Sequence, residues 1–402
     1  MLIVGSGAAG MAAAITAARR GARVRLLERN DEAGKKIRVS GNGRCNIGNR
    51  RIRPERYHSG DREFVRKVLE GYDAPRIEAF LRSLGLEPEE EEEGKLFPMG
   101  RQAASVVRLL TRECQRLGVE LVTGCQVTGI THEQGRFRVE STRGNFEAAR
   151  VLLASGSPAA PQLGASDNGM RFARELGHAL VPPRPALTAL ECDAPWTKRA
   201  AGVKLRARIT LRANGAAVAE REGDLLFTDY GVSGLAVLDL SREASLRLAE
   251  WEPCELSVDL FPSYGKERLT GLLTERIDPE RDLPLDLWLE GVLHRKLVPV
   301  ILERTGTLPS TERQLTRKTI RQLVYTLKRL SLAVTAVREF RYAEVATGGV
   351  DVGGVDPVTM ESKLLPGLFF AGEILDVDGD RGGFNFHWAW TTGMRAGEAM
   401  SR

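Results

Sequence analysis

The sequence of 402 residues has few cysteines and aromatic residues and no long hydrophobic run. Its five cysteines form no CxxC pair and no zinc-ligand spacing, so we predict neither a disulfide scaffold nor a metal site. The longest run of small apolar residues, 8–18, is shorter than a membrane span. No segment of signal-peptide type precedes the first apolar residues. We therefore expect a cytoplasmic protein that does not cross a membrane.

A dominant charge of one sign is also missing. The chain has 58 Lys and Arg against 53 Asp and Glu, which leaves a net charge of +5. That excess suits an anionic cofactor, but it is too diffuse to predict a nucleic-acid partner. The length is sufficient for two or three domains with a large core. Nothing in the sequence predicts an oligomeric state.

The first 28 residues carry the clearest pattern. Three apolar residues at 2–4 predict the end of a buried strand, and a GxGxxG motif occupies residues 5–10. An Ala-rich helix is expected over 11–20, followed by a second apolar run at 24–27 that ends on Glu28. Strand, glycine turn, helix, strand and acid is the order of the dinucleotide-binding βαβ unit.

Each residue type in this unit has a physical role. Gly5 permits a tight turn, Gly7 leaves room for a pyrophosphate, and Gly10 allows close packing of helix on strand. The unpaired N–H groups at the start of the helix favour phosphate. Glu28 would accept hydrogen bonds from ribose hydroxyls, and its charge disfavours a 2′-phosphate. NAD and FAD both remain as candidates from this unit alone.

A proline cluster and a change in hydrophobic spacing mark the predicted boundaries in the middle of the chain. A proline cluster at 182–185 predicts the exit from the first domain. Residues 187–262 mostly alternate, which predicts a β-rich part. Helical spacing returns over 263–342, with helices expected over 287–302 and 316–330.

Basic side chains line the second of these helices, and we interpret them as a solvated surface, with nucleic-acid contact as the alternative. They are Arg317, Lys318, Arg321, Lys328 and Arg329.

The last sixty residues are rich in glycine again. A short buried strand over 368–371 leads into Gly372 and Glu373, and a last helix is expected near 388–400. We predict an α/β fold in which a Rossmann-like dinucleotide-binding domain is built from residues 1–186 and 343–402. The β-rich and helical parts between them would form an inserted substrate domain, 187–342.

Further motifs make the identification narrower. From end to end the chain resembles the two-dinucleotide-binding flavoproteins, and more closely the aminoacetone oxidase-like, BaiN-type family of FAD-dependent oxidoreductases. Besides the N-terminal unit, the resemblance rests on SGNGRCN at 40–46, LLASG at 152–156, LFT at 226–228, GVSG at 231–234, TMESK at 359–363, AGEILDVDG at 371–379 and GGFN at 382–385.

The resemblance implies that FAD binds in extended form, with its ADP end on residues 5–28 and its ring near 382–385. The residues that it assigns to the cofactor are Gly5, Gly7, Ala8, Ala9, Gly10, Glu28, Arg29, Lys36, Ser40, Gly43, Arg44, Cys45, Asn46, Val127, Ala154, Ser155, Gly156, Gly372, Glu373, Asp380, Gly382, Gly383, Phe384 and Asn385.

The expected activity is hydride transfer between flavin N5 and a small organic substrate. No second strand-coupled GxGxxG is found, so NAD(P)H would act as a transient reductant, or the substrate itself would reduce the flavin. His387, which we take as the only histidine near the ring, is a candidate proton donor, with a packing role as the alternative. We interpret Cys45 as a packed thiol. An RNA-modifying or RNA-binding flavoprotein is the second hypothesis.

Overall fold

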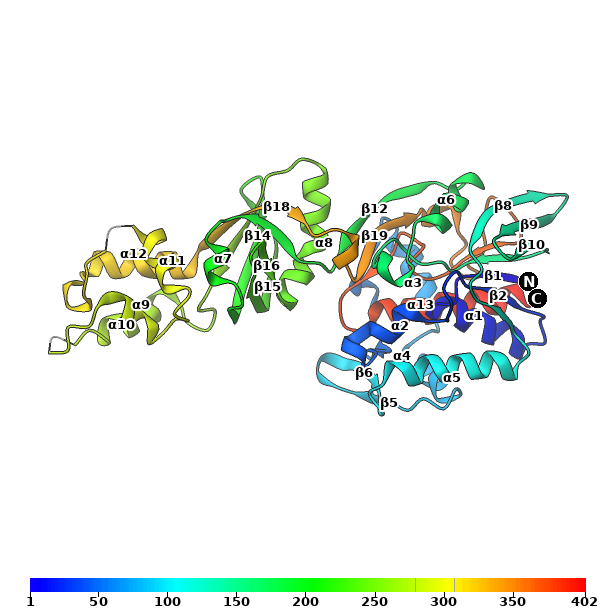
Figure 1. Cartoon of the computed structure of the whole chain (residues 1–402), viewed down its shortest axis with the longest axis horizontal. Coiled ribbons are helices and arrows are strands. Elements are labelled where there is room, and N and C mark those ends of the chain that lie inside the picture. Colours follow the sequence, from blue (N-terminus) through cyan, green and yellow to red (C-terminus); the bar gives the residue numbers. More distant parts are fainter. Residues whose placement is uncertain (279, 307) are drawn as a thin grey trace. The chain divides into compact units, whose positions relative to one another are not determined.

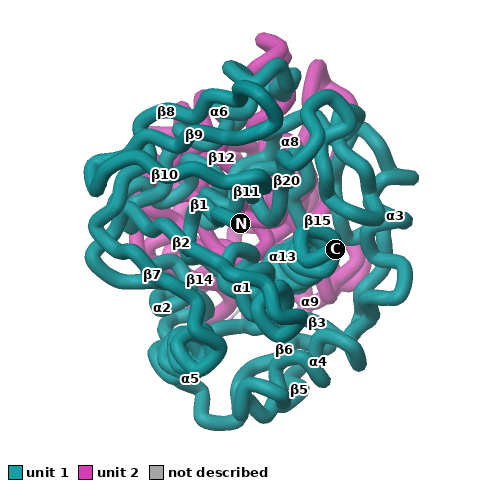
Figure 2. The backbone as a smooth tube through the Cα atoms, turned by 90° about the vertical axis from the view of Figure 1, so that its right-hand side faces the viewer, with its two compact units in different colours: residues 1–184, 344–402 teal, residues 185–343 magenta. Residues whose placement is uncertain are grey.

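The computed structural model describes residues 1–278, 280–306 and 308–402 (Figure 1). The chain divides into two compact units, Met1–Arg184 with Glu344–Arg402, and Pro185–Ala343. Figure 2 shows both chain ends within the first unit. No described helix is long and apolar enough to cross a lipid bilayer.

A five-stranded parallel sheet forms the centre of the first unit, in the order β20-β11-β1-β2-β7. Its strands are β1 (Leu2–Val4), β2 (Arg25–Leu27), β7 (Glu120–Val122), β11 (Val151–Leu153) and β20 (Leu368–Phe370). The three residues of β1, β11 and β20 are all buried, as expected for a parallel sheet covered on both faces. Since β20 pairs with β11, the C-terminal segment completes the sheet that the N-terminus begins.

The two chain ends also meet as helices. α1 (Ala8–Arg19) packs against α13 (Phe384–Met400) through small residues. A Cβ at Gly393 would lie 2.3 Å from the carbonyl oxygen of Ala9, and a Cβ at Gly397 would lie 2.5 Å from that of Ala13. Glycine at both positions is therefore what lets the two backbones approach this closely.

The other elements of the first unit surround this core. They are α2 (Lys35–Val39), η1 (Ser40–Gly43), β3 (Gly48–Asn49), η2 (Pro54–Arg56), β4 (Tyr57–His58), α3 (Arg62–Leu69), α4 (Ala74–Arg82), β5 (Pro88–Glu90), η3 (Glu92–Gly94), β6 (Lys95–Pro98), α5 (Ala103–Arg116), β8 (Val127–Glu133), β9 (Arg136–Ser141), β10 (Gly144–Ala148), η4 (Pro161–Leu163), α6 (Asn168–Glu175), β12 (Leu180–Ala186, which ends in the second unit), β19 (Val345–Val350), η7 (Val352–Gly354) and β21 (Asp378–Gly379).

The second unit is a closed barrel with helices. Its strand order is β13-β16-β15-β14-β17-β18, and alternate residues of β14 and β17 are buried, which is the expected pattern for a barrel wall. The elements are β13 (Leu190–Asp193), α7 (Thr197–Ala200), β14 (Lys204–Ala213), β15 (Ala216–Phe227), β16 (Gly231–Ser233), α8 (Leu235–Ala249), β17 (Cys254–Asp259), α9 (Lys266–Glu275), α10 (Leu285–Glu290), α11 (Val298–Thr305), η5 (Glu312–Gln314), α12 (Arg317–Lys328), β18 (Leu330–Val337) and η6 (Phe340–Tyr342).

The predicted Rossmann-like α/β fold with a β-rich and helical insertion is confirmed, but three details were wrong. α8 lies within the part predicted to be β-rich, and β18 lies within the part predicted to be helical. The single helix expected over 287–302 is two helices, because α10 ends at Glu290, before Gly291, and α11 starts with a proline in its first turn.

Candidate functional site

At two positions of the turn between β1 and α1, contacts within the protein itself require glycine. Gly5 has φ +104°, and a Cβ there would lie 2.5 Å from the carbonyl oxygen of Ala154. A Cβ at Gly10 would lie 1.9 Å from the carbonyl oxygen of Gly5. At Gly7, in contrast, φ is −74° and a Cβ would meet no atom within 4 Å. The protein itself does not require glycine at this position, and a ligand that approaches the backbone would.

The start of α1 fits an anionic ligand for a second reason. Gly7 is its N-cap, and no side chain caps the first turn. The unpaired backbone N–H groups of a helix start, together with the helix dipole, favour a phosphate group at that position.

Glu28 follows β2 and is buried beside the glycine turn. Its Oε2 accepts hydrogen bonds from Ser6 N at 2.9 Å and from Ser6 Oγ at 2.6 Å. Its Oε1 accepts from the backbone N and from Nδ2 of Asn30, both at 2.9 Å. These bonds fix the carboxylate, so a ribose hydroxyl would have to share or replace one of them.

The C-terminal AGE motif lies directly on the first turn of α1. A Cβ at Gly372 would lie 2.9 Å from the Cβ of Ala9. Next to it, Lys36 Nζ lies 2.7 Å from Oε2 of Glu373, which also accepts a 3.3 Å hydrogen bond from Ser157 Oγ. The structure therefore brings four predicted site residues together from opposite ends of the chain: Ala9, Lys36, Gly372 and Glu373.

Two predicted polar side chains have unsatisfied buried atoms. Ser155 Oγ and Asn46 Oδ1 have no hydrogen-bond partner within the described residues. Since an unpaired buried polar group costs about 1–3 kcal/mol, both side chains fit a site that takes a polar ligand.

The SGNGRCN loop contains two residues whose surroundings explain them without a ligand. Cys45 is buried, and burial raises the pKa of its thiol to about 11. Arg44 lies 3.5 Å from Glu91 and over the ring of Phe97, with its guanidinium carbon 4.6 Å from the ring centroid. The first observation supports a packing role for Cys45, and the second shows that Arg44 is already engaged by Glu91 and Phe97.

The loop before α13 is closed by its own side chains. Asn385 Nδ2 donates to the carbonyl of Gly379 at 2.8 Å, and Gly379 N donates to Asn385 Oδ1 at 2.7 Å. Gly383, the N-cap of α13, has φ +98°, and a Cβ there would lie 2.1 Å from the carbonyl oxygen of Gly48. The start of α13 is thus held in one conformation.

Sequence reasoning missed a histidine at this loop. β4 pairs with β21, which sets His58 opposite Asp378. His58 Nε2 then lies 2.9 Å from Oδ1 of Asp380, and Arg56 Nε lies 2.8 Å from Oδ2 of the same carboxylate. No local signal could have found this pair, because the partners are more than three hundred residues apart. His58 is therefore a second histidine beside the loop to which the resemblance assigns the ring, in addition to the predicted His387.

His387 itself is enclosed. It is completely buried, and its Nε2 donates to the carbonyl oxygen of Tyr72 at 2.8 Å. Burial lowers the pKa of the imidazole to about 4, so the ring is neutral near pH 7. These facts favour the packing alternative over the proton-donor role.

The remaining predicted residues lie around this framework. Arg29 Nη1 donates to the carbonyl of Gly164 at 3.3 Å, Val127 is buried at the start of β8, and Gly382 accepts a 2.8 Å bond from Asn49 Nδ2. The others fall within segments already described: Ala8 and Ala9 in α1, Ser40 and Gly43 in η1, Ala154 and Gly156 after β11, and Phe384 at the start of α13.

Comparison with known proteins agrees with this arrangement. A family described as "HI0933-like protein Rossmann domain" matches residues 1–399. The chain is 35% identical to the 3-dehydro-bile acid delta(4,6)-reductase of Clostridium scindens over 99% of this chain and 98% of that protein. It is 31% identical to the ribosomal RNA dihydrouridine synthase of Escherichia coli over 97% of this chain and 95% of that protein.

Two solved structures share the fold. The 3-ketosteroid-delta4-(5alpha)-dehydrogenase of Rhodococcus jostii RHA1 is 16% identical with a TM-score of 0.51, covering 100% of this chain and 96% of that one. The 3-ketosteroid delta1-dehydrogenase of Sterolibacterium denitrificans is 13% identical with a TM-score of 0.52, covering 100% and 98%. At these identities the likeness supports the fold alone.

The family match spans nearly the whole chain, including both chain ends that meet in the first unit. The protein therefore belongs to the HI0933-like Rossmann-domain family of BaiN-type FAD-dependent oxidoreductases.

Proposed function

We propose that this oxidoreductase binds FAD lengthwise along its first unit and reduces a ring carbon–carbon double bond of a small organic substrate. The observation that carries the proposal is the meeting of the two chain ends, where Gly372 lies against Ala9 beside a glycine turn that is open at Gly7. When bound, FAD supplies the hydride chemistry.

The chain's own residues would hold the cofactor at both ends. The N–H groups of α1 would bind the pyrophosphate. Glu28 would hold the ribose if a ribose hydroxyl shared the carboxylate oxygen that now accepts from Asn30. The N-terminus of α13, fixed by Gly383 and Asn385, would stabilise negative charge on the ring.

The substrate class is proposed from the relatives. The names of the bile acid reductase and of the dihydrouridine synthases both describe addition of hydrogen to a ring double bond. A cyclic enone is the substrate that we favour, because the reductase is the more similar of these proteins. Uridine within RNA is the second candidate, supported by the two synthases.

Such a reduction needs a proton as well as a hydride, and His58 is the residue that we propose to hold it. The side chain is only partly buried, and the Asp380 carboxylate fixes its Nε2. Because Arg56 contacts the same carboxylate, the three side chains form one cluster at the loop before α13.

Anaerobic mixing tests the proposed reaction. The purified protein is mixed with NADH or NADPH, then with 4-androstene-3,17-dione as a cyclic enone, while visible absorbance is followed. We expect bleaching by one nucleotide and recovery of absorbance when the enone is added. Bleaching without recovery by the enone, together with recovery by a uridine-containing RNA, would favour the second candidate. Protein without flavin absorbance would contradict both.

A further inference from the structure

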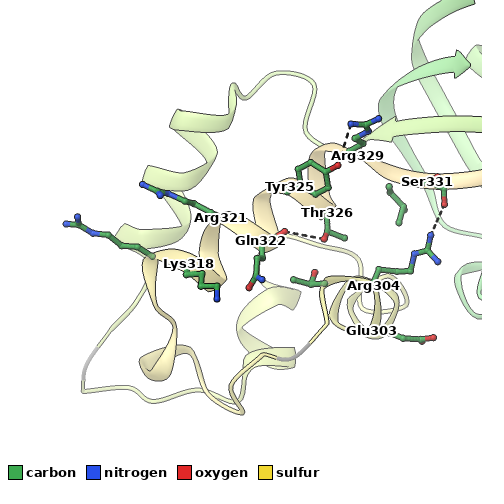
Figure 3. Close-up of a pocket in the computed structure, with 12 residues that line it drawn as sticks. Glu303, Arg304, Lys318, Arg321, Gln322, Tyr325, Thr326, Arg329 and Ser331 are labelled. Carbon is green, nitrogen blue, oxygen red and sulfur yellow. Dashed lines mark hydrogen bonds between the residues drawn. The ribbon is translucent and has the colours of Figure 1, made fainter. Parts of the chain in front are cut away.

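The second unit contains a cationic groove, and none of its described lining residues is among those assigned to the cofactor. It lies among α11, α12 and the start of β18, and its volume is about 930 Å³ (Figure 3). Its lining residues are Glu303, Arg304, Thr305, Arg317, Lys318, Arg321, Gln322, Tyr325, Thr326, Arg329, Leu330 and Ser331. Five of these twelve side chains are cationic and one is a carboxylate, so the groove carries a concentrated positive charge.

Most of this charge is not neutralised within the protein. Arg317, Lys318 and Arg321 have no ion pair or hydrogen bond within the described chain, and all three are exposed. The carboxylate of Glu303 is itself paired with Arg199. Since like charges at helical spacing repel one another, this cluster favours an anionic partner that supplies the missing counter-charges.

Two arginines on the barrel of the same unit are, in contrast, paired with a carboxylate. Arg206 and Arg208, on β14, each contact Glu222 of the neighbouring β15 at 3.0 Å. The groove side of α12 therefore differs from this part of the barrel wall, where the neighbouring strand supplies a carboxylate to both arginines.

The groove also presents an aromatic ring. Arg317, Arg321, Tyr325 and Arg329 follow one another at intervals of four residues, so they form a stripe along α12 and its C-terminus. Tyr325 is 54% exposed, and Arg329 Nη1 donates to its hydroxyl at 3.4 Å, as Figure 3 shows. The opposite face of the helix, with Leu323 and Leu327, is buried. The exposed ring is thus held beside cations on a well-packed helix.

We infer that this groove binds single-stranded RNA, with the cations on the phosphodiester backbone and a base stacked on Tyr325. Regularly spaced cations beside an exposed ring are what backbone-tracking, base-stacking sites use. A membrane-binding face would also need exposed apolar side chains, whereas Tyr325 is the only large one exposed in the described lining. This proposal takes up the alternative of nucleic-acid contact that the sequence left open beside a solvated basic surface, and it does not depend on the flavin site.

The experiment measures binding of a fluorescein-labelled single-stranded RNA of mixed sequence by the full-length, flavin-loaded protein. Anisotropy is recorded between about 50 and 200 mM KCl, where counterion release makes affinity fall steeply. The test variant is Arg317→Gln/Arg321→Gln. Its matched control is Arg108→Gln/Arg112→Gln, which removes two cations that lie on α5 of the first unit and lowers the net charge equally.

We expect the groove variant to weaken RNA binding roughly tenfold and to lower the salt slope by about 1.4, that is, about 0.7 for each lost phosphate contact. The control should bind like the wild type. Tyr325→Ala should weaken binding roughly tenfold at an unchanged salt slope, whereas Tyr325→Phe should keep binding because the ring remains.

Equal losses in the groove variant and the control would overturn the inference, because only net charge would then matter. So would tighter binding to phosphatidylserine vesicles or to poly-glutamate than to RNA. Flavin absorbance and the circular dichroism spectrum, recorded on each variant, separate loss of fold or cofactor from loss of RNA binding.

Discussion

The turn after β1 and the groove along α12 are the two anion sites that we propose, and they are built in opposite ways. At the first, recognition comes from what is missing: Gly7 has no side chain, and α1 has no side-chain cap. At the second it comes from long side chains, with Arg317, Lys318 and Arg321 unpaired and exposed within the described chain. The difference teaches that a backbone site depends on steric fit, whereas a side-chain site depends on the number of charges.

These two designs should fail differently. A single added methyl group can abolish ligand binding at a backbone site, because the backbone cannot move away. Removal of one cation from a side-chain site should only weaken ligand binding, and added salt should have the same effect. The following changes test that contrast, beginning with the largest effect.

Gly393→Ala should lower the free energy of unfolding by at least about 3 kcal/mol, because its Cβ would lie 2.3 Å from the carbonyl oxygen of Ala9. The measurement is urea denaturation followed by circular dichroism. Gly271→Ala in α9 is the control, since its Cβ would meet nothing within 4 Å, and it should be neutral or stabilising by up to about 1 kcal/mol. Similar effects at both positions would show that close packing of α1 on α13 is not what requires glycine.

His387 should make the stability of the protein depend on pH. With its folded pKa near 4, the imidazole is neutral in the folded protein and becomes protonated below about pH 6.5 only in the unfolded chain. Its stabilising contribution, about 3 kcal/mol, is complete above pH 6.5 and is lost as pH falls toward 4. Urea denaturation at several pH values should give a shallower acid dependence for His387→Gln. Parallel curves for variant and wild type would contradict the buried, neutral assignment.

His58→Gln should lower kcat for enone reduction by roughly a hundredfold, with flavin content unchanged, because the proton would lose its carrier. His294→Gln, an exposed histidine of the second unit, serves as the control. A pH–rate profile with the same acidic and basic limbs in His58→Gln and in the wild type would remove His58 from the reaction.

Arg206→Gln should have the smallest effect and sharpens the comparison directly. This arginine is exposed but paired with Glu222, so its loss should change stability by less than about 1 kcal/mol and leave RNA affinity unchanged. RNA binding as weak as that of an Arg321→Gln variant would mean that pairing does not distinguish the two kinds of arginine.

What the sequence could predict follows from how local each feature is. The turn of Gly5 to Gly10 and the acid after β2 are contiguous in the chain, so the βαβ unit was predicted correctly. Closure of the barrel was not predicted, because it depends on the pairing of β18 with β13, about 140 residues earlier. α8 did carry a helical signal, since Ala236, Leu240 and Ala244 are spaced by four and buried. The surrounding alternating segments concealed it.

The site shows the same limit. Glu28 was predicted as a ribose ligand from its spacing, but its bonds to Ser6 and Asn30 depend on side-chain conformations that no spacing encodes. The contact of His58 with Asp380 depends on the pairing of two-residue strands, which have no periodicity to detect.

Flavin retention by Gly7→Leu tests the central claim most directly. The ratio of visible flavin absorbance to protein absorbance is measured after purification and gel filtration, with Gly60→Leu as a control in an exposed loop of the same unit. We predict a colourless but folded Gly7→Leu protein and a yellow control. A folded Gly7→Leu protein that keeps as much FAD as the wild type would contradict the claim that this turn, completed by the C-terminal segment, holds the cofactor.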